Sequence, residues 1–396
     1  MRKKMLFLGL FVGFIFSVNL FSDAIFNFEP EIVDARGLAM GRTSILNNNG
    51  SNAIFSNPAN LAMLENKNMQ FGCRANFGKS ITEYDDSDYE DEEKIEKFHF
   101  KLNHVSFAMP YQFQGSYIKA AFGAGYRTYY DYGYTFYNEQ EDNNYESTRW
   151  SHGGLNTLTF GGAVNFQERF YGGLAINIGI MKKITHEWEV SCESGDDDGD
   201  SDDEISGSFF TLGGIFKVNP QFSLGLMLRP GFEVKYEEEY VDVDYDRDRN
   251  TYKYDYTIPS LFGFGALFQP NEMFLVTAEY QTRGLGNYEV ENEDLYGDSD
   301  NGTSIRIGAE VQSQAPFRFG FFMNSIPIYD YDNDGDRDDA PKSLMGFTGG
   351  LGIPAGPNAT IDISAEYAFT SQEDKDDEYI TSGSQFKFGI TGGFGF

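Results

Sequence analysis

One acidic segment has the residue spacing of a calcium-binding loop. Five aspartates surround one glycine in a D-x-D-x-D-G-D-x-D pattern, at Asp330, Asp332, Asp334, Asp336 and Asp338. Carboxylate oxygens are the ligands that Ca²⁺ prefers, and a glycine at the sixth position permits the sharp turn of an EF-hand loop. The twelfth position, where a bidentate Glu completes such a loop, is Pro341. The sequence therefore predicts either a weak Ca²⁺ site or a solvated acidic loop here, and no other cofactor.

A second set of residues with chemical potential is basic. It falls on the polar parity of segments in which apolar and polar residues alternate. The members that we select as candidates for ligand binding are Arg74, Lys101, Arg127, Arg229, Arg306 and Arg318. Inside an enclosed channel, such cations could hold the carboxylate of an amphipathic ligand through charge-assisted hydrogen bonds. Alternatively, they pair with the few acids of the same parity and only brace the structure; these acids are Glu279, Glu310, Asp362 and Glu366.

Catalytic motifs are not evident in the chain. The histidines belong to no metal or nucleophile motif, and no serine stands in the context of a hydrolase nucleophile. The formal net charge of −31 opposes binding to nucleic acid. The sequence therefore predicts a protein that is not an enzyme and has no nucleic-acid partner.

The elements that must position these residues are strands with one apolar face. In the last segment, the apolar parity holds Phe386, Phe388, Ile390, Phe394 and Phe396. Residues 69–77, 174–181 and 360–369 alternate in the same way. Alternation over runs of about ten residues is typical of transmembrane β-barrels, in which one parity faces lipid and the other faces the lumen. A soluble β-sandwich also alternates and is the competing fold.

Acidic residues divide the alternating runs. They gather in seven segments, at residues 83–97, 138–150, 193–204, 237–252, 289–300, 330–339 and 373–378. Six short turns lie between these segments, near residues 110–116, 167–170, 219–221, 269–272, 312–316 and 354–358. Seven long charged connections and six short turns predict fourteen antiparallel strands, with acidic extracellular loops and both chain ends on the periplasmic side.

Both ends of the chain indicate export to the bacterial outer membrane. A basic cluster at residues 2–4, an apolar run at 5–16 and small residues around Ala24 predict a signal peptide over residues 1–24, with an uncleaved anchor as the alternative. No later run of about twenty apolar residues follows. The terminal Phe396 resembles the signal that outer-membrane barrels present to the barrel-assembly machinery, which is therefore an expected partner of the C-terminal strand.

The second predicted strand changes parity at Asn103 and His104. Phe98, Phe100 and Leu102 are even-numbered, whereas Val105, Phe107 and Met109 are odd-numbered. This change predicts a β-bulge. The bulge either adjusts the curvature of the barrel or marks a wall defect through which a ligand leaves sideways.

Residues 25–66 do not alternate and contain a more specific signal. Residues 34–41 read D-A-R-G-L-A-M-G and include Arg36, and residues 57–62 read N-P-A-N-L-A. This opening resembles the FadL-type long-chain fatty-acid transporters and their relatives. The resemblance implies a fourteen-stranded all-β barrel, formed by residues 67–396, with residues 25–66 folded into the lumen as a hatch. By that resemblance Asn57, Pro58 and Ala59 belong to the hatch, although the glycine that follows Asn-Pro-Ala in many relatives is Asn60 here.

The expected function is passive uptake of hydrophobic or amphipathic small molecules, such as long-chain fatty acids, by a monomer in contact with outer-membrane lipid. Two alternatives stay open. The barrel could instead dock proteins in secretion or surface assembly, or it could be a general porin. The inferred hatch argues against an open porin, and the acidic outer segments leave the substrate class undecided.

Overall fold

The computed structural model describes residues 34–47, 50–86, 89–114, 117–140, 145–180, 183–191, 197–242, 248–284, 289–290, 293–294, 302–326, 342–374 and 379–396. The predicted signal peptide and the aspartates of the predicted calcium loop lie outside these residues. Before the first strand come one short helix and two 3-10 helices, α2 (Ala35–Ala39), η1 (Ser51–Phe55) and η2 (Pro58–Met63). None of the helices in the described part of the chain is long and apolar enough to span a membrane.

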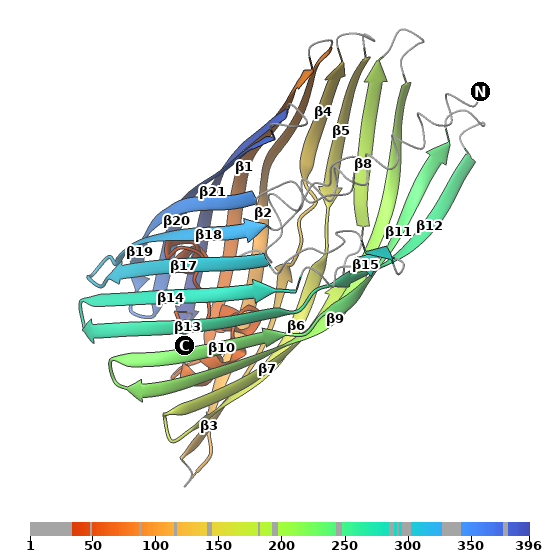
Figure 1. The fold of residues 1–396 in the computed structure, drawn as a ribbon. Coiled ribbons are helices and arrows are strands. Elements are labelled where there is room, and N and C mark those ends of the chain that lie inside the picture. The colour runs from red at the N-terminus through yellow and green to blue at the C-terminus, as the bar shows by residue number, and fades with distance from the viewer. Residues whose placement is uncertain are drawn as a thin grey trace.

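All strands belong to one antiparallel sheet (Figure 1). Its first strands are β1 (Asn68–Asp86), β2 (Tyr89–Gln112), β3 (Ile118–Thr128), β4 (Tyr134–Gln140), β5 (Tyr145–Gly153), β6 (Asn156–Phe166), β7 (Phe170–Ile180), β8 (Lys183–Ser191), β9 (Asp197–Asn219) and β10 (Phe222–Arg229). The others are β11 (Phe232–Asp242), β12 (Asp248–Ile258), β13 (Leu261–Asn271), β14 (Phe274–Arg283), β15 (Glu289–Val290), β16 (Glu293–Asp294), β17 (Gly302–Val311), β18 (Phe317–Ile326), β19 (Lys342–Gly356), β20 (Ala359–Asp374) and β21 (Tyr379–Gly395).

The sheet closes into a barrel of fourteen strands. Closure occurs at β1, which pairs with β2 on one side and with β21 on the other. Where a barrel strand is interrupted, its two parts carry separate labels, as for β3 and β4, β5 and β6, β7 and β8, β10 and β11, and β12 and β13. The short strands β15 and β16 pair with each other in the connection between β14 and β17. The predicted strand number is therefore confirmed.

The interruptions have local causes in the sequence. Pro230 and Gly231 separate β10 from β11, and Pro259 lies between β12 and β13. Proline has no backbone N–H to donate to a neighbouring strand, so it ends the pairing. Gly153 is the last residue of β5 and Gly154 follows it, with φ angles of +118° and +146° that side-chain-bearing residues rarely adopt.

The outside of the barrel is apolar and its inside is polar. On β7, Ile176 is 50 % exposed whereas Asn177 is 1 % exposed, and the other strands alternate similarly. Exposed aromatic residues cluster near the short turns, and they include Tyr111, Phe113, Tyr117, Phe166, Phe170, Phe268, Phe274, Phe317 and Phe396. An apolar outer belt with an aromatic girdle is the surface of a transmembrane β-barrel. The protein is thus an outer-membrane barrel, and a soluble sandwich is excluded because the apolar parity is on the outside.

The parity change in the second strand is a β-bulge, as predicted. Gly72 pairs with His104, but the next residue, Cys73, pairs with Leu102, so Asn103 is the extra residue. Asn103 and His104 both point inward and are buried. The extra residue therefore keeps the apolar side chains on the outside of the barrel both before and after the bulge.

The acidic segments differ from the predicted loops. Most of residues 83–97 lie in β1 and β2, whose pairing continues to Asp86 opposite Tyr89. Most of residues 237–252 likewise lie in β11 and β12. Charged side chains do not interrupt backbone pairing, and exposed pairs such as Lys253 with Glu237, 2.9 Å apart, offset part of the repulsion. The barrel wall therefore continues beyond the membrane belt as long ribbons on one side (Figure 1).

Candidate functional site in the barrel lumen

Residues 34–47 and 50–66, here called the N-terminal segment, lie inside the barrel. Helix α2 contacts β18 to β21, while η1 and η2 contact β2, β3, β6, β7 and β9 on the other side of the lumen (Figure 1). Nearly every residue from Ala35 to Ala62 that the structure describes is buried. The segment therefore reaches from one wall to the other, and it contains all four residues that the sequence assigned to a hatch, Arg36, Asn57, Pro58 and Ala59.

The Asn-Pro-Ala motif forms the turn that begins η2. The side-chain oxygen of Asn57 accepts a hydrogen bond from the Ala59 N–H at 3.1 Å, and Pro58 occupies the first position of the helix, where no N–H is needed. The Asn57 Nδ2 donates to the carbonyl of Ile45 at 2.9 Å and to that of Leu226 on β10 at 3.3 Å. One asparagine thus caps its own helix and ties it to the wall.

The same turn rests on a pair of glycines, Gly173 and Gly213, here called the glycine platform. Gly173 of β7 and Gly213 of β9 are paired in register. A Cβ on Gly173 would lie 2.5 Å from the Ala59 nitrogen, and one on Gly213 would lie 1.9 Å from the Asn57 Oδ1. On the adjacent pair, Gly172 and Gly214, a Cβ would meet no other atom within 4 Å. Only the inward-facing pair is therefore shaped to the motif.

Two arginines fix the other half of the segment to the opposite wall. Arg36 places its Nε 3.0 Å and its Nη2 3.2 Å from the two carboxylate oxygens of Glu310 on β17. Arg42 binds Glu366 on β20 in the same two-pronged manner, with its Nε at 2.8 Å, and both side chains are almost fully buried. Bidentate pairs of this kind fix orientation as well as distance.

A third wall carboxylate holds the backbone of the segment. Glu279 of β14 accepts hydrogen bonds from the N–H groups of Ser44 at 2.8 Å and Ile45 at 2.6 Å. Arg306 of β17 completes this contact by donating to the Arg42 carbonyl at 2.8 Å. Three of the four inward acids that the sequence identified are therefore direct partners of the N-terminal segment.

The six basic candidates divide into two groups. Four of them are engaged with other polar groups of the barrel. Arg318 contacts Glu310 and Asp362, each at 2.5 Å, and Lys101 pairs with Asp131 at 2.5 Å. Arg74 donates to Asn103 at 2.8 Å, and Arg306 is bound as described above. For these four, the bracing interpretation explains the observed contacts.

Arg127 and Arg229 differ from the other four. Both are buried, yet in the part of the chain that the structure describes no carboxylate pairs with either. The Arg229 Nη1 donates to the Tyr129 hydroxyl at 2.9 Å. The Arg127 guanidinium lies 4.7 Å from the Tyr129 ring centroid and 5.5 Å from that of Phe55 in η1. Cation–π contacts replace ion pairs here, and among the described residues they leave two positive charges without a counter-ion.

An apolar cluster adjoins the two arginines. The ring centroids of Tyr129 and Phe209 are 4.5 Å apart, and those of Phe209 and Phe232 are 4.4 Å apart. Its buried members, here called the outer cluster, are Tyr129, Leu155, Ile184, Ile205, Phe209, Phe232 and Val234. Apolar side chains beside an uncompensated cation match the two ends of an amphipathic anion.

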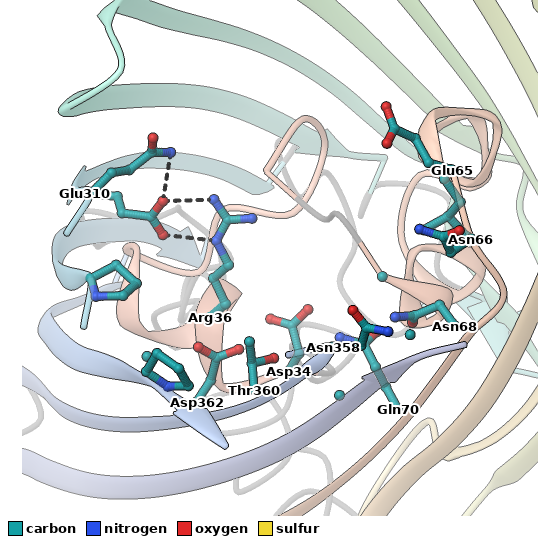
Figure 2. A pocket seen from close by; sticks show the side chains of 18 of the residues that line it. Asp34, Arg36, Glu65, Asn66, Asn68, Gln70, Glu310, Asn358, Thr360 and Asp362 are labelled. Carbon is teal, nitrogen blue, oxygen red and sulfur yellow. Dashed lines mark hydrogen bonds and ion pairs between the residues drawn. The ribbon is translucent and has the colours of Figure 1, made fainter. Parts of the chain in front are cut away.

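A cavity of about 500 Å³ lies at the mouth of the barrel on the side of the short turns, between those turns and the start of the N-terminal segment. Figure 2 shows Asp34, Arg36, Gln70, Glu310 and Asp362 around it, with Arg36 reaching across to Glu310. Twelve of its twenty lining residues are charged or carry a side-chain amide, and its arginines are paired with carboxylates. The chemistry of this mouth is therefore that of a solvated vestibule beneath the segment.

Sequence reasoning missed one polar constellation and the glycine platform. Ser151, His186 and Asp203 form a hydrogen-bonded row on β5, β8 and β9. Strand register brings these three together, and no spacing along the chain could have shown it. Nothing in the sequence distinguishes Gly173 and Gly213 from the other glycines of the strands. Within the described residues, no three His, Cys, Asp or Glu side chains are grouped to hold a metal, and the calcium loop stays a prediction.

Comparison with known proteins supports the fold. No family model matches the sequence, and no curated protein matches it either. A Pseudomonas aeruginosa FadL homologue superposes with a TM-score of 0.64 at 11 % identity, over 92 % of this chain and 98 % of that one. The Pseudomonas putida toluene transporter TodX gives 0.62 at 13 %, over 93 % and 99 %. The Ralstonia pickettii toluene transporter TbuX gives 0.59 at 14 %, over 94 % and 100 %.

The chain is therefore a closed outer-membrane β-barrel. More particularly, its fold is the FadL-type fold over more than nine-tenths of the chain, as the sequence resemblance implied.

Proposed function

We propose that this protein is a passive outer-membrane channel for hydrophobic and amphipathic small molecules, of which long-chain fatty acids are the best fit. The observation that carries the proposal is the placement of Arg127 and Arg229, which pair with no carboxylate among the residues that the structure describes, beside the outer cluster. The structural neighbours include a FadL homologue and two toluene transporters, which supports a hydrophobic cargo.

The two ends of such a ligand would be bound separately. Its carboxylate would sit between Arg127 and Arg229 and bind both through charge-assisted hydrogen bonds. Its chain would lie against Tyr129, Phe209 and Phe232, which are the aromatic members of the outer cluster. A neutral hydrocarbon would use only the second of these contacts, so the pair of arginines favours an anionic amphipath.

The N-terminal segment would act as the hatch below this site. The ring of Phe55 in η1 lies against the Arg127 guanidinium. A ligand that binds this guanidinium would therefore lie directly against the N-terminal segment. Arg36, Asn57, Pro58 and Ala59 would hold the hatch closed in the resting state. Release into the periplasm would follow either a shift of this segment towards the polar mouth or a sideways exit at the Asn103 bulge.

A docking role in secretion or surface assembly is the second candidate, and the long acidic ribbons favour it. Such ribbons present a large charged surface beyond the membrane, which uptake of a small molecule does not require. In either role, we propose a monomer that is inserted by the barrel-assembly machinery through β21.

Uptake of a fluorescent long-chain fatty acid separates the candidates. Cells that produce the protein should accumulate the probe, while the purified protein shows little conductance in planar bilayers. Steady open-pore conductance would instead identify a general porin. A closed barrel without uptake of any hydrophobic probe, which co-purifies with a surface or secreted protein, would identify the docking role.

A further inference from the structure

Four strands of the extracellular wall are joined by a buried row of polar side chains. The Ser151 hydroxyl on β5 lies 2.7 Å from the His186 Nδ1 on β8, and the His186 Nε2 lies 2.9 Å from the Asp203 Oδ2 on β9. The Tyr236 hydroxyl on β11 donates to the same oxygen of Asp203. Ser151, His186 and Asp203 are each 2 % exposed or less. The row therefore crosses β5, β8, β9 and β11, which are neighbours in the sheet.

The row lies outside the membrane belt. The outward-facing neighbours of these residues include Glu187, Glu189 and Glu204, all exposed, whereas the lipid-facing residues of β7 and β9 lie nearer the periplasm. The row faces inward and adjoins the outer cluster, because Ile184 and Ile205 are two residues away from His186 and Asp203.

The hydrogen bonds define one protonation state of the ring. A carboxylate only accepts hydrogen bonds, so the His186 Nε2 must carry the proton that points to Asp203. In a neutral imidazole the Nδ1 is then an acceptor, and the Ser151 hydroxyl is its donor. A second ring proton would turn the Nδ1 into a donor. Ser151 would then have to accept a hydrogen bond from the Nδ1–H and direct its own hydrogen to another acceptor, although its side chain is fully buried.

We propose that Ser151, His186, Asp203 and Tyr236 form a pH-sensitive latch that holds β5, β8, β9 and β11 together near neutral pH and loosens when His186 gains a proton.

The charges around the ring agree with this direction. Burial lowers the pKa of His186 below its ordinary value of 6.5, and Arg149 on β5 acts in the same direction. Asp203 and Asp202 on β9 oppose this shift, although Asp202 also pairs with Lys183 at 2.7 Å. Because the folded ring binds a proton less readily than the unfolded one, acid weakens the latch. Its stabilising effect is complete above the ordinary pKa and is lost as the pH falls through the lowered one.

A consequence for uptake rests on the proposed function. The latch adjoins the outer cluster, so a protonated His186 would loosen the extracellular side of the ligand site. The latch itself does not depend on the identity of the ligand, and the following tests do not measure uptake.

Hydrogen exchange of the purified barrel tests the latch. Protection factors for residues 145–153 and 183–191 should decrease as the pH is lowered from about 7.5 to about 5, after correction for the intrinsic exchange rate. His186→Gln should abolish that dependence. His152→Gln, which changes an exposed histidine next to Ser151, should retain it. Equal pH dependence in His186→Gln and in the unaltered protein would overturn the proposal.

Nitrogen NMR of protein with ¹⁵N-labelled histidine tests the protonation state of His186 directly. At neutral pH the His186 ring should be neutral and protonated on Nε2, and it should titrate below 6.5. Ser151→Ala removes the hydrogen bond that the hydroxyl donates to the Nδ1 lone pair of the neutral ring, so His186 should titrate at higher pH in this variant. A neutral ring protonated on Nδ1, or a titration that Ser151→Ala leaves unmoved, would contradict the latch.

Discussion

Gly173 of β7 and Gly213 of β9 lie opposite each other, and the Asn-Pro-Ala turn of the N-terminal segment rests on both. Neither position tolerates a side chain without moving that turn, whereas Gly172 and Gly214 next to them have free space. This relationship explains how a short segment with little regular structure is held in a wide barrel. Backbone lies directly on backbone at one wall, and arginines are bound by carboxylates at the other.

Gly213→Leu should dislodge the segment, because the new side chain would occupy the position of the Asn57 amide. We expect a clear rise in planar-bilayer conductance over the unaltered protein. Gly214→Leu, one residue away and facing the other side, is the matched control and should leave conductance low. If the two variants conduct equally, the glycine platform does not position the segment.

Arg42→Met should destabilise the barrel more than any exposed ion-pair change, since it leaves Glu366 buried without its main partner. Breaking such a buried pair costs about 3–5 kcal/mol. Lys253→Met removes an exposed partner of Glu237, with side chains 69 % and 42 % exposed, and should cost about 0–1 kcal/mol. Denaturant unfolding, followed by the gel shift between folded and boiled barrel, measures both. Similar costs for the two would show that the buried clamp has no special role.

Ile178→Arg should cost roughly 2–4 kcal/mol if the position lies near the membrane midplane, because it places a charge against lipid. Residues of the inward parity make poor controls, since Asn177 is buried and accepts a hydrogen bond from Thr159 at 2.8 Å. Glu187→Arg, at an exposed position on the ribbon beyond the membrane belt, is the better comparison and should be nearly neutral. Unfolding in detergent micelles or bilayers measures the difference, and a harmless Ile178→Arg would mean that the membrane belt is misplaced.

Arg127→Met and Arg229→Met should each weaken binding of a long-chain fatty acid roughly 10- to 100-fold, the loss expected for one charge-assisted hydrogen bond of about 1.5–3 kcal/mol. The corresponding fatty alcohol, which lacks the carboxylate, should bind both variants and the unaltered protein alike. Titration of a fluorescent ligand in detergent gives the affinities. An equal loss for acid and alcohol would mean that the arginines only shape the outer cluster.

The sequence was sufficient to predict the barrel because alternation, short turns and chain ends are local signals. Parity placed Glu279, Glu310 and Glu366 on the inside, and the parity change at Asn103 located the bulge. It could not show that these acids bind the N-terminal segment while Arg127 and Arg229 lack acidic partners among the described residues. These contacts depend on which residues of strands that are distant in the sequence lie at the same height along the barrel axis.

The prediction that the acidic segments form loops was wrong for much of their length. Residues 83–97 are so acidic that a loop was expected, yet their backbone pairs in register as far as Asp86 and Tyr89. Strands that are exposed to solvent can carry charged side chains on both faces, because these side chains do not disturb the backbone hydrogen bonds. The row from Ser151 to Tyr236 was hidden for a related reason, because its members are close only once four strands are aligned.

The most direct test of the proposed function is an experimental structure of the protein purified in mild detergent and saturated with a long-chain fatty acid. We expect the carboxylate between Arg127 and Arg229, the chain against Tyr129 and Phe209, and the N-terminal segment below them. A lumen without ligand density at the two arginines, under conditions in which the fatty acid is bound elsewhere or not at all, would contradict it.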